Sequence, residues 1–350
     1  MTTLRIAMLS FAHVHARDYA RQVHAHPEAT LQCIWDDDEA RGREAATMFE
    51  VPYERDLQVV LGRADVDAVL INAPTVQHTE LILAASAKHK HIFTEKALTV
   101  TSADADKVVQ AVRQSGVQFM ISLPSRTTPE TLFIKSALDQ GLLGKITLMR
   151  ARIAHNAALD HWFHDGSAWF GDAGLAGGGA LFDLGCHTVD VMRWFMGEPT
   201  SVIAKVQNFS GAYNIDDNAV AVVEFKNGGL GILDVSWVQR AGVNPLEIYG
   251  TEGYLSRTSA PGQSLILASQ QLDLHGYPTG GIPWTIPTEL PKALPTALQQ
   301  WVSACLHGTP TTINVEDGRN LTELLEGIYT SARTHGEYRF AAQQVGVRAS

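Results

Sequence analysis

The sequence predicts a two-part α/β protein: an N-terminal Rossmann domain with a doubly wound parallel sheet, then an α+β domain with a largely antiparallel open sheet. In the first 124 residues, short apolar runs alternate with amphipathic segments, which is typical of parallel strands joined by crossover helices. Later apolar runs are joined by hairpin signals such as Asn227-Gly228, which favour antiparallel strands. At 350 residues, the chain is longer than one hydrophobic core usually grows. We therefore expect domains at 1–124 and 125–350.

The first part is predicted to contain five strands separated by four helices. The strands are Leu4–Leu9, Thr30–Trp35, Val66–Ile71, His91–Thr94 and Gln118–Ser122. The helices are His15–His24, Asp38–Phe49, Gln77–Lys88 and Ser102–Ser115. Because the carboxyl ends of parallel strands lie at one edge of a sheet, the polar residues that follow these strands should meet there and bind a ligand.

The second part begins with the helix Pro129–Gln140 and the strand Ile146–Ile153, followed by a polar, glycine-rich stretch, 154–179. A long helix is predicted over Ala180–Phe195, because Gly197 and Pro199 end it. The strands after it are Ser201–Phe209, Asn218–Phe225, Gly229–Val238, Asn244–Gly250 and Gly253–Arg257. The segment 259–294 is rich in Pro and Gly and is predicted to be an irregular loop. Two helices close the chain, Pro295–His307 and Val315–Thr334.

Composition excludes several classes of protein. The apolar content of 45% and charged content of 18% are those of a soluble globular protein, and the net charge of −10 comes without a basic stripe, which argues against nucleic acid as a partner. No apolar run approaches the roughly 20 residues of a membrane span. Cys33, Cys186 and Cys305 are too scattered for a disulfide framework or a cysteine zinc site. We therefore expect a cytoplasmic protein.

The loop after the first strand is a candidate dinucleotide-binding loop. A dinucleotide fingerprint has glycines between strand and helix, so that the backbone can approach a pyrophosphate at the helix N-terminus. Here small residues occupy the first two glycine positions and a histidine occupies the third, so an ordinary βα turn is the alternative. The residues predicted to contact the cofactor are Ser10, Phe11, Ala12, His13 and Val14.

Asp36 follows the second predicted strand, where a carboxylate accepts hydrogen bonds from the adenosine ribose hydroxyls and repels a 2′-phosphate. This position favours NAD, although Arg41 and Arg43 nearby keep NADP possible. The alternative role for Asp36 is a helix N-cap, shared with the two aspartates that follow it.

Lys96, Asp183 and His187 are candidates for proton chemistry. Lys96 follows a strand, where a buried lysine with a lowered pKa would donate to a substrate oxygen; a solvated surface charge is the alternative. Asp183 and His187 are four residues apart on the predicted helix and share a face, with Asp190 placed to fix the tautomer of His187. The alternative is a helix histidine held by local carboxylates.

Four motifs occur in a recognisable order along the chain. They are Asn72-Ala73-Pro74, Glu95-Lys96-Ala97, an Arg-x-x-Pro at Arg126, and a Gly-Gly-Gly-x-x-x-Asp-x-Gly-x-His-x-x-Asp that starts at Gly177. With the Rossmann-like start, this set resembles the glucose–fructose oxidoreductase, inositol dehydrogenase and rhizopine-catabolism (Gfo/Idh/MocA) family of NAD(P)-dependent oxidoreductases, over nearly the whole chain.

The resemblance implies hydride transfer between a nicotinamide and a hydroxyl or carbonyl carbon of a sugar, cyclitol or related polyol. It implies that Lys96, Asp183 and His187 are catalytic, with Ala97 where the family has proline. Further cofactor contacts are implied for Asn72, Ala73, Pro74, His78, Glu95, Lys96 and Arg126. It also implies a homodimer or homotetramer formed through the open face of the second sheet.

The mechanism expected from these residues uses His187 as the base for the substrate hydroxyl, Lys96 as a hydrogen-bond donor to the same oxygen, and Asp183 to orient the substrate or His187. The stretch 155–169, rich in histidine and tryptophan, would form a lid or pocket wall. Predicted substrate contacts are Lys96, Arg126, His155, Trp162, Asp183 and His187.

The sequence is also compatible with two other functions. The first is a metal enzyme using His13, His15, His161, His164 and His187, but no His-Glu-x-x-His or comparable ligand spacing occurs, so we predict no metal. The second is a non-catalytic nucleotide-binding sensor of the same fold, suggested by the glycine-poor loop. Retention of Lys96, Asp183 and His187 together argues against it.

Overall fold

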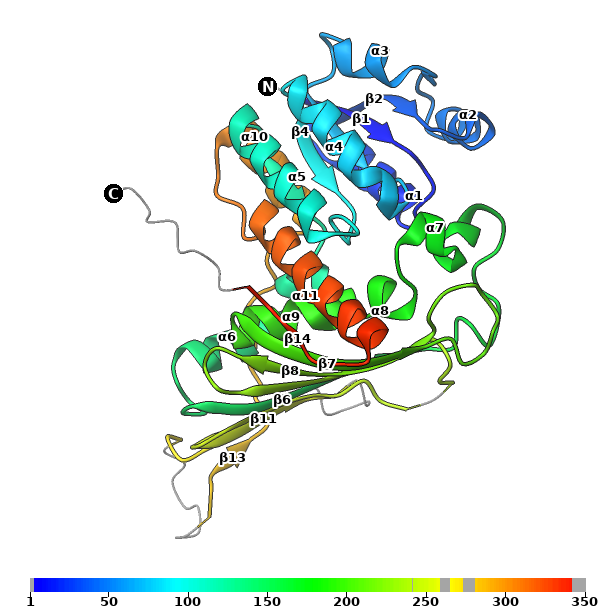
Figure 1. Ribbon diagram of the computed structural model, residues 1–350. Helices are drawn as coiled ribbons and strands as arrows, with labels where there is room; N and C mark the ends of the chain where they lie inside the picture. Colours follow the sequence, from blue (N-terminus) through cyan, green and yellow to red (C-terminus); the bar gives the residue numbers. More distant parts are fainter. Residues whose placement is uncertain (1–2, 241, 259–264, 273–280, 342–350) are drawn as a thin grey trace.

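The computed structural model describes residues 3–240, 242–258, 265–272 and 281–341. Two sheets form separate layers, and the long helix α11 (Val315–Thr334) lies between them (Figure 1). The N-terminal layer is at the top of that view and the larger sheet is at the bottom.

The first sheet has the strand order β2-β1-β3-β4-β5, and all its neighbouring strands are parallel. Its strands are β1 (Leu4–Leu9), β2 (Ala29–Trp35), β3 (Ala68–Ile71), β4 (His91–Thr94) and β5 (Phe119–Ile121). Helices cover both faces, so the central strand β3 is apolar and buried throughout. The predicted doubly wound parallel sheet is confirmed.

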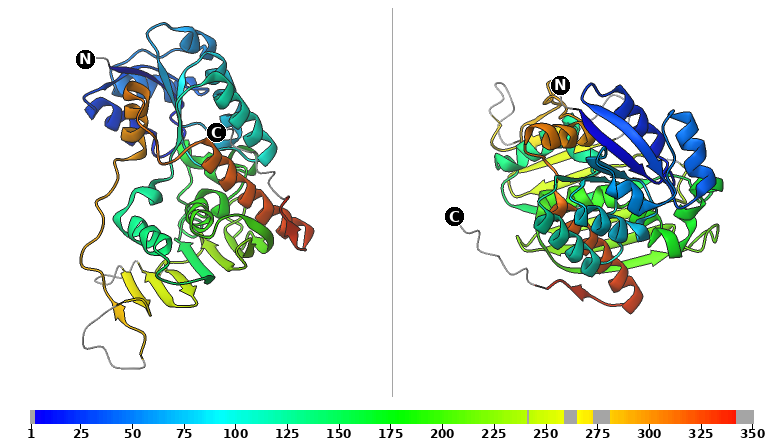
Figure 2. Two further views of the ribbon diagram at one scale, coloured as in Figure 1. Left: turned by 90° about the vertical axis from the view of Figure 1, so that its left-hand side faces the viewer. Right: turned by 90° about the horizontal axis from the view of Figure 1, so that it is seen from above.

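Six helices belong to this layer: α1 (Ala16–Ala25), α2 (Glu39–Met48), α3 (Leu57–Gly62), α4 (His78–Ala87), α5 (Ser102–Ser115) and α10 (Ala297–His307). Helices α1 and α10 lie on one face, and α4 and α5 lie on the other (Figure 2). Helix α3 was missed from the sequence because it has only six residues, started by the cap of Asp56. Since α10 packs on β1, β4 and β5, a domain boundary at residue 124 stays a prediction.

The second sheet has nine strands in the order β13-β12-β11-β10-β6-β9-β8-β7-β14. Its strands are β6 (Ile146–Ala154), β7 (Pro199–Gln207), β8 (Asn218–Phe225), β9 (Leu230–Ser236), β10 (Leu246–Gly250), β11 (Gly253–Arg257), β12 (Leu265–Ser269), β13 (Trp284–Thr285) and β14 (Tyr338–Arg339). Among the strands in the described part of the chain, only β6 and β9 pair in parallel, so the largely antiparallel sheet is confirmed.

The prediction of an irregular loop over 259–294 is wrong where β12 and β13 form. β12 pairs with β11 and buries Leu265 and Leu267, so the strand is stabilised by a neighbour that sequence periodicity does not reveal. Residues 259–264 and 273–280 of this segment lie outside the described residues.

One face of this sheet is covered by helices, which are α6 (Pro129–Asp139), α8 (Ala180–Asp183), α9 (Cys186–Met196) and α11. Shorter turns of helix lie at the edge of this sheet and over the first sheet. These short elements are η1 (Thr75–Gln77), η2 (Pro124–Thr127), η3 (Asp165–Gly171) and α7 (Ala173–Ala176).

The single helix predicted over 180–195 is wrong. The N–H of Gly185 donates to the carbonyl of Ala180, five residues back, and the chain starts a new helix at Cys186.

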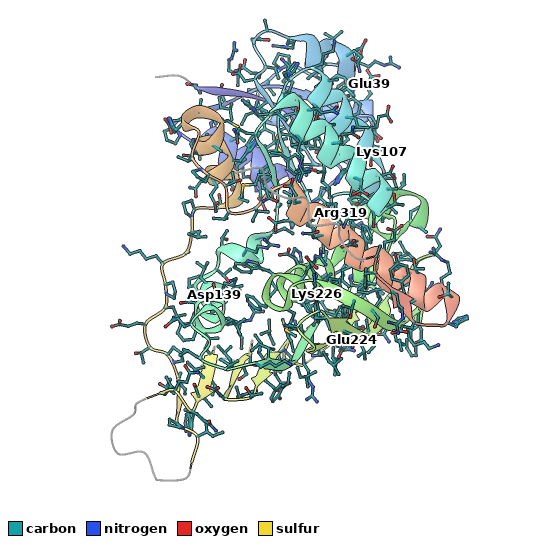
Figure 3. The ribbon with its side chains drawn as sticks, turned by 60° about the vertical axis from the view of Figure 1, so that its left-hand side comes forward. Glu39, Lys107, Asp139, Glu224, Lys226 and Arg319 are labelled. Carbon is teal, nitrogen blue, oxygen red and sulfur yellow. The ribbon has the colours of Figure 1, made fainter. Side chains whose placement is uncertain are left out.

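Helix α11 connects the two layers. It begins with a capping box between Asn314 and Asp317. Arg319 of α11, which is labelled in Figure 3, donates a hydrogen bond to Asp106 on α5. Among the described residues, no helix is both long and apolar enough to cross a membrane.

Candidate active site

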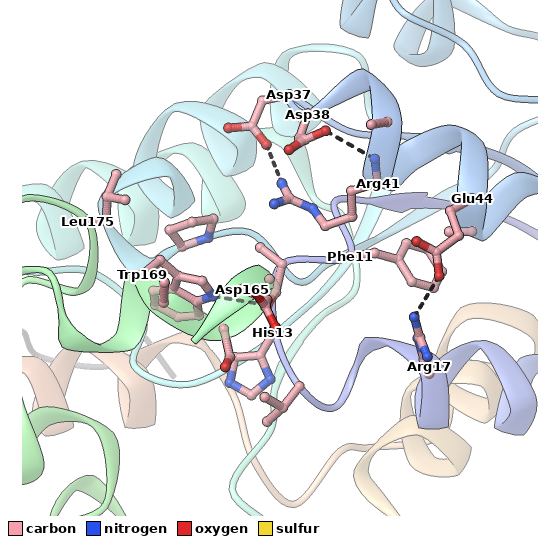
Figure 4. Close-up of a pocket in the computed structure, with 18 of the residues that line it drawn as sticks. Phe11, His13, Arg17, Asp37, Asp38, Arg41, Glu44, Asp165, Trp169 and Leu175 are labelled. Carbon is pink, nitrogen blue, oxygen red and sulfur yellow. Dashed lines mark hydrogen bonds and ion pairs between the residues drawn. The ribbon is translucent and has the colours of Figure 1, made fainter. Parts of the chain in front are cut away.

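Two cavities lie at the carboxyl edge of the first sheet. The larger has a volume of about 760 Å³ and lies over the loop that leaves β1 (Figure 4). Its walls include Phe11, Ala12, His13, Val14, Asp37, Arg41, Pro74 and Trp169. This is the edge at which doubly wound sheets bind ligands.

The loop from Ser10 to His15 is held by its own hydrogen bonds. Ser10 takes a left-handed backbone conformation, with φ of 71°, where the fingerprint has its first glycine. The N–H of Phe11 donates to Asp36, that of Ala12 to Ser10 Oγ, and that of His13 to the carbonyl of Asn72. Within this fully described loop, the N–H of Val14 donates to no protein acceptor. Few backbone donors therefore remain for a pyrophosphate, unlike in the glycine fingerprint.

The structure does not bring Asp36, which is predicted to contact the ribose, to either cavity. Asp36 is only 2% exposed and accepts from Phe11 N–H at 2.7 Å and Arg41 Nε at 2.9 Å. Burial raises the pKa of Asp36, and the Arg41 guanidinium opposes that rise. Asp38 is the N-cap of α2, and Asp36 accepts its backbone N–H at 3.0 Å, so the alternative role at the start of the helix is shared between these aspartates.

Asp37 reaches the cavity instead. Its carboxylate accepts from Arg41 and from Gln77, both at 2.8 Å, and Figure 4 shows it at the cavity wall. Asp37 could not be singled out from the sequence because three consecutive aspartates follow β2, and only the turn of the chain decides which carboxylate faces outward. The acidic run was the available signal.

The second cavity has a volume of about 460 Å³ and lies between the two layers. Its walls include all three residues predicted to be catalytic, and it shares His13, Val14 and Ser167 with the larger cavity. The full wall comprises His13, Val14, His15, Lys96, His155, Trp162, Phe163, Ser167, Phe170, Asp183, Leu184 and His187.

Lys96 follows β4 and is 6% exposed. Its Nζ donates to Asp183 Oδ1 at 2.8 Å and to the carbonyl of Asp183 at 2.9 Å. The lowered pKa expected for this lysine is wrong: burial disfavours the ammonium, but the Asp183 carboxylate outweighs burial and raises the pKa of Lys96. An ammonium has three donors, so one remains for a ligand oxygen. The Lys96–Ala97 peptide is cis.

His187 and Asp183 both face this cavity, although the chain breaks its helix between them. Burial, reinforced by the Lys96 charge, lowers the pKa of His187 to about 4. Burial favours the neutral form of Asp183, yet Lys96 reverses this effect and lowers the pKa of Asp183. At neutral pH, the cavity therefore holds an ammonium–carboxylate pair beside a neutral imidazole.

Arg126 and Asp190 lie apart from this group. The Arg126 guanidinium binds Asp190 at 2.9 and 2.6 Å and Asp317 at 2.8 Å, and lines neither of the two cavities. The tautomer-fixing role expected for Asp190 is therefore wrong, because its carboxylate is bound by Arg126. Arg126 joins η2 to α9 and α11 and does not contact either cavity.

The loop after β3 divides between the cavity and the interior. Pro74 lines the larger cavity, whereas Ala73 and His78 are buried. Nδ1 of His78 lies 2.9 Å from the carbonyl oxygen of Ala97 and Nε2 lies 3.0 Å from that of Ala73, so the ring connects the loops that follow β3 and β4. Asn72 is fully buried, and neither atom of its side-chain amide has a hydrogen-bond partner.

The stretch 155–169 forms part of the cavity wall. His155 and Trp162 stack with ring centroids 4.8 Å apart, and both line the smaller cavity. Trp169 Nε1 donates to the carbonyl of Ala12 at 2.9 Å, which connects this stretch to the loop after β1. His161 and His164 line neither cavity.

The five histidines considered for a metal do not converge. His13, His15 and Glu95 do place their ligand atoms within 4.8 Å of one another. However, His13 Nδ1 accepts from the N–H of His15, so the proton of the neutral ring is on Nε2, and a metal there would require that bond to break. His15 Nδ1 is already bonded to Glu95 Oε1 at 3.0 Å. No local pattern in the sequence indicates this bond between the loop after β1 and the strand-end glutamate, because the two residues are 80 positions apart.

Comparison with known proteins gives two family matches. Residues 4–123 match the family described as "Oxidoreductase family, NAD-binding Rossmann fold", and residues 131–256 match the "GFO/IDH/MocA C-terminal domain".

Among curated relatives, the chain is 26% identical over 254 residues to a levoglucosan dehydrogenase of Pseudarthrobacter phenanthrenivorans, covering 64% of each chain, which is less than two thirds of that protein. It is 27% identical to a myo-inositol 2-dehydrogenase of Thermotoga maritima, covering 70% of this chain and 73% of that one. A solved levoglucosan dehydrogenase in complex with NADH and L-sorbose shares the fold, with a TM-score of 0.83, 20% identity, and coverage of 97% of this chain and 99% of that one.

Proposed function

The chain belongs to the Gfo/Idh/MocA family, as its motif order predicted, and on that premise we propose that it is an NAD(P)-dependent oxidoreductase acting on a sugar, cyclitol or related polyol. One observation supports this most strongly. Lys96, Asp183 and His187 share a cavity of about 460 Å³ that has wall residues in common with the larger cavity over the loop after β1. A substrate in the smaller cavity would thus meet a cofactor in the larger one.

The residues around the larger cavity fit a dinucleotide. The cavity lies at the strand ends of a parallel sheet, and nearby buried polar atoms lack hydrogen-bond partners, namely the Asn72 amide and His13 Nε2, which lies 3.7 Å from Glu95 Oε2. The loop from Phe11 to Val14 would lie against the pyrophosphate, with the Val14 N–H as its free backbone donor. Asp37 would bind the adenosine ribose, and Pro74 and Trp169 would form side walls of the cavity. Bound NAD would supply the acceptor for a hydride.

Five residues of the smaller cavity have distinct roles in the proposed reaction. His187 is neutral because its pKa is lowered to about 4, so its ring can accept the proton of a substrate hydroxyl. Lys96 stays charged and directs its third N–H at the same oxygen, which stabilises the developing negative charge. Asp183 holds the Lys96 ammonium in place through the bond of 2.8 Å. Trp162 and His155 offer stacked rings against which a sugar face can pack.

The direct test is a fluorescence titration with NADH and with NADPH. Turnover assays would follow on levoglucosan, myo-inositol and D-apiose, the compounds after which three related dehydrogenases are named. We expect NADH to bind more tightly, because the Asp37 carboxylate repels a 2′-phosphate. The variant Asp37→Ser should reduce that preference by about tenfold or more, because it removes the repulsion between the carboxylate and a 2′-phosphate, and like charges in contact cost several kcal/mol. The matched control Glu39→Gln removes a charge from α2 outside the cavity wall and should leave the preference unchanged.

Failure of the unmodified protein to bind either nucleotide at millimolar concentration would reject the oxidoreductase proposal. Binding without turnover of any polyol would favour the non-catalytic sensor. If Asp37→Ser leaves the cofactor preference unchanged, Asp37 does not bind the adenosine ribose.

We also propose that the chain forms a homo-oligomer through the open face of the second sheet. Ile203, Val220, Val222 and Leu230 are exposed side chains on β7, β8 and β9, and Ile203 pairs directly with Val222. An Ile203→Glu variant should shift the mass measured by light scattering to that of a monomer, because burying the carboxylate at an apolar interface is costly. An unchanged oligomer, or a monomeric starting protein, would reject this interface.

The cytoplasm remains our proposal for its location. All three cysteines are free thiols in the structure, which suits a reducing compartment.

A further inference from the structure

His15, like His187, lies in the wall of the smaller cavity, and its ring is hydrogen-bonded to a buried carboxylate. His15 precedes the first residue of α1, and its Nδ1 lies 3.0 Å from Glu95 Oε1. Glu95 is fully buried, whereas the His15 side chain is 47% exposed and forms part of the cavity wall with Lys96 and His187. Because Nδ1 donates to the carboxylate, Nε2 is the ring atom left for the cavity or solvent.

We propose that His15 and Glu95 form a proton-relay dyad that carries the substrate's hydroxyl proton from His187 to solvent, with His15 exchanging the proton and Glu95 positioning the ring. This inference rests on the oxidoreductase function proposed above. It assigns His15 a role in the reaction that neither the motifs nor the family matches indicate.

The proposal follows from where the proton must go. When the C–H bond breaks, its hydride moves to the nicotinamide of NAD, and the O–H proton moves to His187, leaving a carbonyl. His187 is partly buried and must lose this proton before the next oxidation, whereas His15 is exposed. The proton would pass through water in the shared cavity to His15 Nε2 and from there to bulk solvent. His187 is then neutral again, and Glu95 remains ionised throughout.

The charges around the dyad support transfer in this direction. His15 is faced by Glu95, His13, Tyr19, Lys96, Asp183 and His187. The hydrogen bond to Glu95 raises the pKa of His15 despite partial burial, while burial lowers the pKa of His187 to about 4. A proton on His187 therefore passes to a more basic ring. Burial lowers the pKa of His13 to about 3, so that ring stays neutral and does not compete.

Glu95 is suited to its part in the dyad because it stays charged. Burial favours its neutral form, but the His13 and His15 rings outweigh burial and lower the pKa of Glu95. Its second oxygen, Oε2, accepts the backbone N–H of Lys96 at 3.0 Å, which fixes the carboxylate beside the ring. This is the arrangement in which a carboxylate orients a histidine and stabilises its protonated form.

The test compares His15→Gln with His24→Gln, which removes an exposed histidine from the other end of α1. The assay uses NAD with whichever of levoglucosan, myo-inositol and D-apiose turns over fastest. We expect His15→Gln to lower kcat by about tenfold or more, with KM and the Kd of NADH changed less than about threefold. Added imidazole should restore the rate, and the pH profile of kcat should lose one ionisation. His24→Gln should behave like the unmodified protein.

Unchanged kcat and an unchanged pH profile in His15→Gln would overturn the relay, and so would a loss accompanied by weaker NADH binding that imidazole cannot rescue. A nuclear magnetic resonance titration of the histidine rings needs no turnover and separates this proposal from the function itself. His15 should titrate above the ordinary histidine pKa of about 6.5, and Glu95→Gln should lower that value. An ordinary pKa for His15 would reject the dyad even in an inactive protein, and inactivity with a raised pKa would reject only the oxidoreductase function and its relay.

Discussion

A Lys96→Met variant is expected to lose about 10³-fold in kcat, the largest effect on turnover of any single change in the cavity. Methionine keeps the length of the side chain but removes the charge and all three donors. The substrate oxygen then loses its hydrogen bond as negative charge develops, and the Asp183 carboxylate is left without the partner that it holds at 2.8 Å. Steady-state kinetics with NAD and the best polyol measure the loss.

The control for this prediction is Lys107→Met, which removes an exposed ammonium from α5. It should keep full turnover. NADH fluorescence should show a Kd for Lys96→Met within about threefold of the starting value, because Lys96 lies in the wall of the smaller cavity and not of the larger one. If Lys96→Met retains turnover within threefold, the role assigned to Lys96 is wrong.

A Gly179→Ala variant is expected to lose about 2–4 kcal/mol of unfolding free energy, or to fail to fold. A Cβ at this position would lie 1.9 Å from the carbonyl oxygen of Asp216 and 2.8 Å from its carbonyl carbon. These are backbone atoms that cannot turn aside as a flexible side chain would. Urea unfolding followed by circular dichroism measures the change.

The same substitution should also reduce turnover, because the contact positions Asp183. The Asp216 carboxylate accepts the N–H groups of Gly179 and Leu181 at 2.7 and 3.1 Å, and thereby fixes the start of α8. Displacing α8 moves Asp183, which ends that helix, away from Lys96. The matched control is Gly62→Ala, where an added Cβ meets nothing within 4 Å, and its stability should be nearly unchanged. Equal stability of both variants would show that the close approach at Gly179 does not constrain the fold.

Much of the fold could be predicted from local pattern. The bounds of β1, β4, β8, β11, α5 and α11 agree with the sequence analysis, because apolar periodicity, caps and Gly or Pro ends are properties of neighbouring residues. The order of the motifs also identified the family, since it depends only on spacing along the chain. Where local pattern is weak, prediction failed: β12 depends on its neighbour β11, and α3 is too short to show a period.

In the candidate site too, some features follow from the sequence and others only from the tertiary structure. The sequence by itself determined which residue types meet at the carboxyl edge of the first sheet, because parallel topology brings strand ends together wherever the strands occur. Only the tertiary structure decided that Asp37 rather than Asp36 faces the cavity, that Asp190 binds Arg126, and that Glu95 binds His15. Each of these depends on side-chain direction and on partners far apart in the chain. The charge states follow from the same cause, since the pKa of a buried group is set by which opposite charge the fold places beside it, and periodicity carries no record of that neighbour.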